Sequence, residues 1–317
     1  MLFGRSQSKT YGLQILDHEI KCVGLQVVNR QFQMLEQFSL PLPPGSMMKG
    51  RVLNRELVIQ NLQKLVYEHQ MQHANVVLTI PTANILIRRS KFQNVKDREL
   101  RNLVDVELHG EDKLPFKNPV FDYMRIGEPT EDGQVELLIF ATPEELISSY
   151  SGLIKAAELK LKGIDIGSLA LLRILANEQS PVDRGSHLMI LNMESDHADV
   201  CILKDGLPTF LRSIALSSSN VMYSANGALE SYCRTLSMEI SRITNFYKYS
   251  LNDNASDIDF VFLSGQADYV NEAPMYLRNQ FHGQIGALPL PNVTNLDEAI
   301  WTSYAVPLGL AMKGGIV

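Results

Sequence analysis

The sequence predicts an α/β protein built from two related halves, and three observations carry this prediction. A unit of three short β-rich segments separated by polar turns occurs twice, beginning near residues 11 and 187. A segment with helical spacing then precedes an almost wholly apolar strand, which indicates a crossover connection. The chain has 317 residues and is 45% hydrophobic, which is enough for two domains with their own cores. We therefore expect two duplicated domains that face a cleft, with an inserted α+β module.

Each copy of the repeated unit is expected to form a three-stranded antiparallel meander, because short β-rich runs alternate with tight polar turns. The first copy comprises Tyr11–Leu16, a turn over Asp17–Glu19, Ile20–Gln26 and Phe32–Leu40. The second copy comprises Leu188–Met193, a turn over Glu194–Asp196, Ala198–Lys204 and Thr209–Ala215.

The segment after the first meander predicts a helix and then a buried strand. Apolar residues recur at helical spacing over Arg55–Gln72. The run Asn75–Pro81 follows, and its unbroken apolar character favours a strand buried on both faces. These elements complete a first domain over residues 1–81.

An inserted module is predicted over residues 82–163. It contains expected strands at Ile85–Lys91 and Val135–Thr142 and expected helices at Lys96–Leu108 and Glu144–Leu159. Residues 164–184 are then expected to return the chain to the first domain through a helix at Asp165–Ala176 and a linker at Pro181–Ser186.

The second domain is predicted over residues 185–317, with a helical subdomain at 216–257 and a terminal helix at 299–317. Between the meander and the terminal helix we expect a polar loop at Ser217–Asn220, a long helix at Tyr223–Leu251, a loop at Asn252–Asp257, a buried strand at Phe260–Leu263 and a helix at Asn271–Phe281. Pro307 lies inside the terminal segment, so we expect a kink or a late helix start there.

Composition excludes several classes of function. A formal charge of -6 argues against a nucleic-acid surface, because phosphate binding requires clustered Lys and Arg. The three cysteines form no CxxC pair, which favours a reducing compartment. No apolar run approaches the ~18 residues that cross a bilayer, and residues 1–10 lack a hydrophobic signal core. We therefore expect a cytoplasmic protein without direct membrane insertion.

No motif gives positive evidence of catalysis. The chain has no Gly-x-Ser-x-Gly elbow, no phosphate-binding Walker loop and no GxGxxG. His69 and His73 are four residues apart on an expected helix, which would suit a two-histidine metal contact, but no further ligand accompanies them. A solvent-facing pair is the favoured interpretation, and we expect no metal site.

The order of these elements resembles the actin-like ATPase superfamily, which includes actin, the sugar kinases and FtsA. Shorter motifs narrow the resemblance to the PilM family of type IV pilus assembly, an FtsA-like family in the cytoplasm. The motifs lie at Thr79–Pro81, Ile87–Arg89, Leu103–Leu108, Leu114–Phe116, Val120–Tyr123, Leu169–Arg173, Asp205–Gly206, Arg212–Ile214 and Tyr304–Ala311. The resemblance covers nearly the whole chain, and the motifs of the inserted module are the specific ones.

The resemblance implies a partner. PilM proteins receive the N-terminal cytoplasmic peptide of the membrane protein PilN in a groove beside the inserted module, which would hold this chain at the inner face of the membrane. Other pilus-platform proteins and a second copy of the chain are further partners that the family implies. The groove candidates here are Ile85, Ile87, Arg89, Leu100, Leu103, Val104 and Glu107. The apolar members of this stripe have a second interpretation as the core of the module.

The chain departs from the family at the nucleotide site. In the family each meander turn carries Asp-x-Gly, whose Asp holds a metal-bound water and whose Gly admits the phosphate. Gln14 and Leu16 stand at these positions in the first turn, and Asn192 and Glu194 in the second. The remaining positions of the altered site are Asp17, Lys21, which matches a family lysine, and Gly265 and Gln266 of the nucleoside loop.

Charge indicates how much these changes matter. A carboxylate such as Glu194 about 4 Å from a phosphate oxygen is repelled by up to ~4 kcal/mol at an effective dielectric near 20. We therefore expect a nucleotide site without function, no cofactor and no ATPase activity. Two alternatives stay open: Gln14 and Asn192 bond a metal-bound water, or Glu194 and Asp196 bind Mg²⁺ themselves.

The sequence thus favours a cytoplasmic scaffold for a type IV or competence pilus. The first rival is an ATP-binding switch with atypical phosphate-loop residues. The second is a structural protein of another machine, such as an FtsA-like polymer or a secretion platform, because one fold serves many functions.

Overall fold

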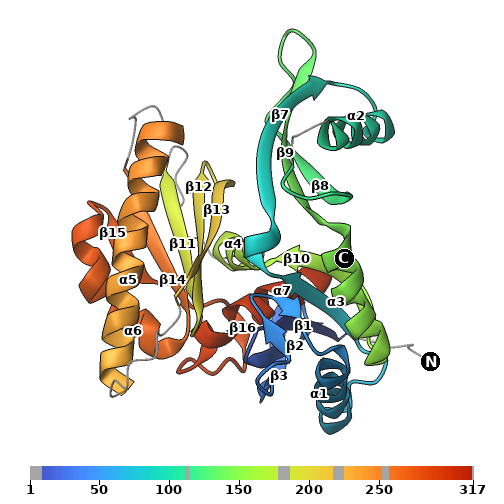
Figure 1. Ribbon diagram of the computed structural model, residues 1–317, viewed down its shortest axis with the longest axis vertical. Helices are drawn as coiled ribbons and strands as arrows, with labels where there is room; N and C mark the ends of the chain where they lie inside the picture. The colour runs from blue at the N-terminus through green and yellow to red at the C-terminus, as the bar shows by residue number, and fades with distance from the viewer. Residues whose placement is uncertain (1–8, 111–113, 178–185, 217–224, 252–256, 316–317) are drawn as a thin grey trace. The chain divides into compact units, whose positions relative to one another are not determined.

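The computed structural model describes residues 9–110, 114–177, 186–216, 225–251 and 257–315, and the chain forms two compact units. Unit 1 comprises Met1–Thr82 and Leu153–Val317, and unit 2 comprises Ala83–Gly152. Unit 1 contains two large sheets, and unit 2 contains a smaller one (Figure 1). The loops expected at 217–220 and 252–257 and the linker expected at 181–186 lie outside the described residues, apart from Ser186 and Asp257.

The first sheet of unit 1 has the strand order β10-β6-β1-β2-β3-β16. Its strands are β1 (Thr10–Ile15), β2 (Glu19–Val28), β3 (Gln31–Pro41), β6 (Asn75–Ile80), β10 (Lys160–Ile166) and β16 (Val293–Thr294). The first three form the predicted antiparallel meander, and β6 runs parallel to β1. The prediction that β6 is buried on both faces is confirmed, because it lies between β1 and β10 and five of its six residues are buried. A small hairpin of β4 (Met47–Met48) and β5 (Arg51–Val52) follows β3.

Helix α1 (Arg55–Glu68) connects this hairpin to β6. It begins after Asn54, whose side chain accepts a hydrogen bond from the Leu57 amide at 3.1 Å, a cap that contributes about 1 kcal/mol. Its buried face consists of Val58, Leu62, Leu65 and Val66, which recur at the i, i+3, i+4 spacing of an amphipathic helix.

The second sheet repeats the plan of the first, with the strand order β13-β12-β11-β14-β15. Its strands are β11 (His187–Met193), β12 (His197–Lys204), β13 (Leu207–Ala215), β14 (Phe260–Gly265) and β15 (Gln284–Ala287). The strands β11, β12 and β13 form the second meander, and β14 runs parallel to β11 as β6 does to β1. The predicted duplication is therefore confirmed.

Two helices cover the second sheet and share an apolar core with it. They are α5 (Ala225–Phe246), which continues into a π-helical turn at Tyr247–Leu251, and α6 (Ala267–Leu277), which continues into a 3₁₀ turn at Arg278–Gln280. Leu236, Ile240 and Ile243 of α5 are buried against Met189 and Leu191 of β11 and their neighbours.

A core shared by both sheets joins them into one unit. Helices α4 (Gly167–Asn177) and α7 (Ala305–Gly315) supply residues of this core, together with residues of both meanders. Glycine lets α7 approach α4 closely, since a Cβ on Gly309 would lie 2.1 Å from the Ala170 carbonyl oxygen. A Cβ on Gly12 of β1 would lie 1.8 Å from the Pro307 carbonyl oxygen.

Several element boundaries differ from those expected. Helix α6 begins and ends four residues earlier than the expected Asn271–Phe281. The terminal helix begins at Ala305, after a 3₁₀ turn at Trp301–Tyr304, and not at Ala299. This is the late start near Pro307 that the sequence allows, and Pro307 lies in the first turn, where proline is tolerated. Helix α3 (Glu144–Ala156) ends three residues before the expected Leu159. Asp165 and Ile166, expected in a helix, belong to β10, because they pair in register with β6.

The pairing of β10 with β6 also places residues 160–166 in unit 1, whereas the sequence-based boundary of the inserted module lies at residue 163. Helix α3 begins in unit 2 and ends in unit 1. No helix in the described parts of the chain has the length and apolar character to cross a bilayer.

Unit 2 is an α+β module. It contains the sheet β7-β9-β8 and helix α2, and a 3₁₀ turn at Thr82–Asn84 lies at its boundary with unit 1. The three strands are β7 (Leu86–Gln93), β8 (Pro119–Ile126) and β9 (Gln134–Pro143), and the helix is α2 (Asp97–His109). Leu100, Val104 and Leu108 of α2 pack on one face of the sheet against Leu137 and Ile139 of β9.

Candidate functional site

The two meander turns are built in the same way, which fixes the correspondence between their residues. The Leu16 amide donates to the Glu19 carbonyl at 2.8 Å, and the Glu194 amide donates to the His197 carbonyl at 2.9 Å. Leu16 and Glu194 therefore occupy equivalent places, as do Gln14 and Asn192 two residues before them. The structure thus places the two halves of the altered nucleotide motif at the ends of β1 and β11.

An ion pair joins these two turns. Lys21 Nζ lies 2.8 Å from Glu194 Oε2, and the two side chains are only 3% and 1% exposed. Glu19 Oε1 lies 3.5 Å from the same nitrogen, and Asn192 Nδ2 donates to Glu194 Oε1 at 3.4 Å. Burial opposes the charge on Lys21, but the fields of Glu194 and Glu19 outweigh it and raise its pKa. The lysine that would meet a phosphate is therefore held by a carboxylate of the opposite sheet.

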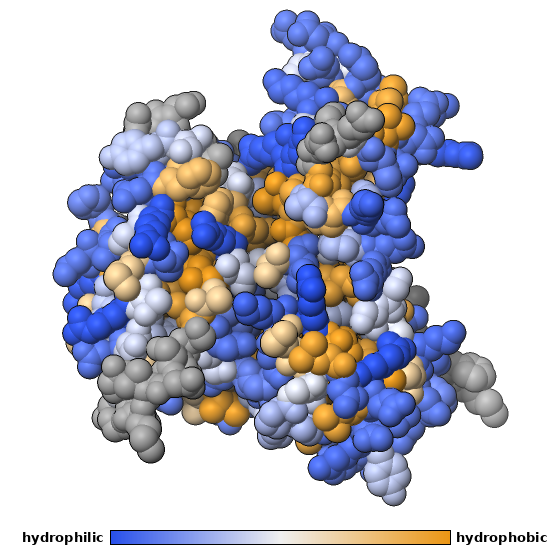
Figure 2. Space-filling model, in the orientation of Figure 1, coloured by the Kyte–Doolittle hydropathy of each residue, from blue (hydrophilic) through white to orange (hydrophobic). Residues whose placement is uncertain are grey.

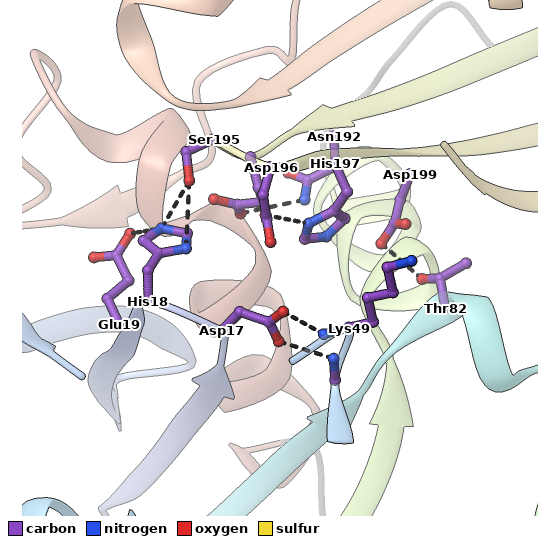
Figure 3. A network of polar contacts seen from close by, with 12 residues as sticks. Asp17, His18, Glu19, Lys49, Thr82, Asn192, Ser195, Asp196, His197 and Asp199 are labelled. Atoms are coloured by element: carbon purple, nitrogen blue, oxygen red, sulfur yellow. Dashed lines mark hydrogen bonds and ion pairs between the residues drawn. The ribbon is translucent and has the colours of Figure 1, made fainter. Parts of the chain in front are cut away.

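Two histidines extend the network (Figure 3). His18 Nε2 lies 3.2 Å from Glu19 Oε1 and 3.1 Å from the hydroxyl of Ser195, so it faces residues of both turns. Its hydrogen bond to Glu19 raises its pKa despite burial. His197 Nδ1 lies 2.7 Å from Asp196 Oδ1. Burial lowers the pKa of His197, but the bond to Asp196 and the neighbouring carboxylates raise it overall to about 9.

A third polar contact joins the two sheets beside these turns. The Thr82 hydroxyl, just beyond β6, donates to Asp199 Oδ2 of β12 at 2.7 Å (Figure 3). The other oxygen of Asp199 is buried and has no hydrogen-bond partner among the residues that the structure describes. The contacts of Lys21, His18 and Thr82 therefore all run from the first sheet to the second.

Other residues of the predicted nucleotide site have structural partners. Asp17 accepts hydrogen bonds from the amides of Lys49 and Gly50, the latter at 2.8 Å, and so anchors the β4–β5 hairpin. Gly265 has a φ of 105°, and a Cβ there would lie 2.0 Å from the Met193 carbonyl oxygen. The Gln266 amide donates to that same oxygen at 2.9 Å. Contact between β14 and β11 is therefore sufficient reason for glycine at this position.

Negative charge dominates the site. Four carboxylates lie in the network, and the cations that face them are one lysine and two histidines; the carboxylates belong to Glu19, Glu194, Asp196 and Asp199. A further feature is Gln14 Oε1, which is buried and has no hydrogen-bond partner in the described part of the chain. Among the described residues, no group of three or more His, Cys, Asp or Glu side chains is arranged to hold a metal ion.

His69 and His73 do not share a helical face, so the geometry expected for that pair is wrong. Helix α1 ends at Glu68, with His69 as its C-cap, and His73 follows with a φ of 59°. His69 stacks on Phe38 with ring centroids 3.4 Å apart, and its Nδ1 lies 3.0 Å from Glu36. Its role is therefore packing and pairing at the helix end.

Two of the groove candidates in unit 2 are core residues. Leu100 and Val104 are fully buried in the unit's own core, so they present no surface to a partner. Leu103 is 41% exposed on the same helix, and Val106 is 72% exposed. Figure 2 shows apolar side chains at α2 among hydrophilic neighbours.

The remaining groove candidates lie at the surface of unit 2 or near it. Glu107 pairs with Arg88 at 3.0 Å. Ile85 and Ile87 are partly buried, and Arg89 is exposed. These residues, together with Leu103, are the part of the predicted groove that a partner can reach on unit 2.

Sequence reasoning missed the contacts that join the two sheets. It identified Lys21 and Glu194 as positions of the expected nucleotide site but did not pair them, and it did not link His18 with Ser195 or Thr82 with Asp199. The available signal was the opposite charge of two residues at corresponding turns. That signal becomes specific only once the two sheets are known to face each other.

The fold and this site together define an actin-like protein: two halves that each begin with a meander, and an inserted unit between β6 and β10. Solved structures with this fold include the ethanolamine utilization protein EutJ of Carboxydothermus hydrogenoformans, with a TM-score of 0.54 and 9% identity over 97% of this chain and 90% of that chain. The cytoplasmic domain of EpsL, an inner-membrane component of the Vibrio cholerae type II secretion system, has a TM-score of 0.52 and 8% identity over 96% and 95% of the chains.

The chain belongs to the family of type IV pilus assembly protein PilM, whose model matches residues 12–222. It is also similar to a chain of a PilM-PilN type IV pilus biogenesis complex, with a TM-score of 0.80 and 18% identity over 99% of this chain and 100% of that chain. A comparison with curated proteins finds no match. The resemblance seen in the sequence is thus confirmed at the level of family and fold.

Proposed function

We propose that this protein is a scaffold for the assembly of a type IV pilus or competence pilus, which binds the N-terminal cytoplasmic peptide of a PilN-like inner-membrane protein. The observation that carries this proposal is the family match over residues 12–222. The likeness of the whole chain to a chain of a PilM-PilN complex supports it. On this proposal the protein works in the cytoplasm, at the inner face of the membrane, through its partner.

Unit 2 supplies the docking residues in this proposal. Leu103 offers an exposed apolar side chain, and Ile85, Ile87 and Arg89 lie on or just before β7, a strand at the edge of its sheet. An edge strand presents unpaired amide and carbonyl groups to an extended peptide, and apolar side chains beside it give specificity. The buried Leu100 and Val104 act indirectly, by holding α2 on the sheet.

We further propose that the nucleotide site does not function and that the protein is not an ATPase. Lys21 is already paired with Glu194, and a polyphosphate would have to break that buried pair. It would also enter a network that contains four carboxylates, and a carboxylate about 4 Å from a phosphate charge repels it by up to ~4 kcal/mol at an effective dielectric near 20. Neither meander turn has the glycine that would admit a phosphate.

The unpaired oxygen of Gln14 favours a second candidate function, an ATP-binding switch. A buried acceptor without a partner costs free energy, and a metal-bound water would satisfy it. In this alternative Gln14 and Asn192 take the place of the family's two aspartates, and Lys21 exchanges Glu194 for a phosphate.

One experiment separates the two candidates. The melting temperature is measured against Mg-ATP up to 5 mM and, separately, against the N-terminal peptide of a PilN-like protein from the same organism, with a scrambled peptide as control. The scaffold proposal predicts a rise with the native peptide alone. A rise with sub-millimolar Mg-ATP would establish the switch, and equal responses to the native and scrambled peptides would refute docking.

A further inference from the structure

We propose that the Lys21–Glu194 ion pair is an intramolecular clasp that holds the two sheets of unit 1 together in the way a bound nucleotide would. The inference rests on the proposed loss of nucleotide binding, since a protein that bound ATP there would have to release the clasp. It assigns a role to two residues that the pilus scaffold function leaves unexplained.

The two residues of the pair belong to the meanders of different sheets. Lys21 lies on β2 in register with Gln14, and Glu194 follows β11 in the equivalent turn of the other meander. The two residues are 173 positions apart in the chain, so their contact depends entirely on how the two sheets are held. A change in the relation of the sheets would separate the charges.

The burial of both side chains makes the ion pair costly to open. A surface ion pair contributes little, whereas a pair with side chains 3% and 1% exposed leaves an uncompensated charge when it opens. Opening the sheets without admitting a ligand or water would therefore be strongly unfavourable. Asn192 adds to this effect by donating to the second carboxylate oxygen of Glu194.

Neighbouring contacts act in the same direction. The His18–Ser195 and Thr82–Asp199 contacts join the same two sheets, at 3.1 Å and 2.7 Å. The apolar core around α4 and α7 joins the sheets as well, so it can act as a hinge. The clasp then determines whether the sheets stay in one arrangement about that hinge.

The test measures the distance between the two sheets in solution. Spin labels at Gln60→Cys on α1 and Met238→Cys on α5 occupy exposed positions. The three native cysteines are fully buried and stay unlabelled. Double electron–electron resonance then gives the distribution of distances between the two labels. The rate of amide hydrogen exchange in the two meander turns reports how often the site opens.

Lys21→Met and Glu194→Gln are compared with the unchanged chain. Each is expected to broaden the distance distribution and to speed amide exchange in both turns by at least tenfold, and the double variant is expected to add little to either single change. Glu36→Gln is the matched control, because Tyr11 donates to Glu36 within the first sheet. It is expected to lower the melting temperature without widening the distribution.

The outcomes distinguish the clasp from the proposed function. A narrow distribution and unchanged exchange in both single variants would overturn the clasp. If the unchanged chain itself gains stability with Mg-ATP, the proposed loss of nucleotide binding fails, whatever the variants show. Should neither single variant fold, Glu194→Asp serves instead, because its shorter side chain keeps the charge but draws the carboxylate away from Lys21. It is expected to give intermediate broadening, and no broadening would again overturn the clasp.

Discussion

Leu16 and Glu194 occupy the same place in the two meander turns, since the amide of each donates to the carbonyl three residues later. One is apolar and buried, and the other is charged and buried against Lys21. The duplicated fold thus repeats the backbone of the turn with different chemistry in each copy, an apolar side chain in the first and a carboxylate paired with Lys21 in the second. The first prediction follows from this relationship.

Restoring the family residues should restore nucleotide binding. The variant with Gln14→Asp, Leu16→Gly, Asn192→Asp and Glu194→Gly removes the internal partner of Lys21 and opens both turns to phosphate. At a hundred times the dissociation constant, bound Mg-ATP would contribute ~2.7 kcal/mol, a rise of about 4 °C in melting temperature. The same variant with Lys21→Met should respond less. A quadruple variant that folds but gains nothing from Mg-ATP would contradict the prediction.

The stability of the site should fall as pH rises. His197 has a pKa of about 9, above its ordinary value of 6.5, because it is paired with Asp196 and faces Asp199 and Glu194. Its contribution, of order 3 kcal/mol at most, is fully present below pH 6.5 and is lost as pH rises through 9. Urea unfolding between pH 6 and 9.5 should show this loss, and His197→Gln should remove it. His282→Gln, at an exposed position, should leave the pH dependence unchanged.

The approach of α7 to β1 should tolerate no side chain at Gly12. Gly12→Ala places a Cβ 1.8 Å from the Pro307 carbonyl oxygen, so the helix must shift away from the sheet. We expect a loss of about 3 kcal/mol or more in the free energy of unfolding, measured with urea. Gly286→Ala is the control, because a Cβ there meets nothing within 4 Å. Equal effects of the two substitutions would show that the packing is looser than described.

The docking residues of unit 2 can be tested without disturbing its core. Leu103→Asp changes an exposed side chain and should weaken binding of the PilN-like peptide at least tenfold, or ~1.4 kcal/mol, with an unchanged melting temperature. Lys64→Asp, at an exposed position of α1, is the control and should leave the affinity unchanged. Isothermal titration calorimetry measures both. Full affinity of Leu103→Asp would exclude this part of α2 from the docking surface.

The sequence predicted the elements whose signals are local. Each meander has alternating β-rich runs and polar turns, and β6 has an unbroken apolar run, so these strands were identified before their pairing was known. Strand β10 was not recognised, because Asp165 and Ile166 adjoin a helical pattern and only the pairing with β6 makes them a strand. An apolar stripe on α2 predicted a helix but did not distinguish the core residue Val104 from the exposed Leu103.

The site shows the same division between local and distant signals. The replacement of the family's aspartates and glycines was visible at single positions, such as Glu194. The pairing of Glu194 with Lys21 was not, because nothing in either segment records which partner the fold supplies. The partners of Asp17 were not predictable for the same reason, since they are amides of the distant hairpin at Lys49 and Gly50.

Trp301 is the single tryptophan of the chain, and it lies in the 3₁₀ turn that leads into α7. Its ring is 5% exposed in the core where α4, α7 and both sheets meet. The tryptophan fluorescence of the protein, which excitation near 295 nm selects over that of tyrosine, therefore arises from one indole at the joint between the sheets. A red shift of its emission would report that water has entered this joint, without any added dye.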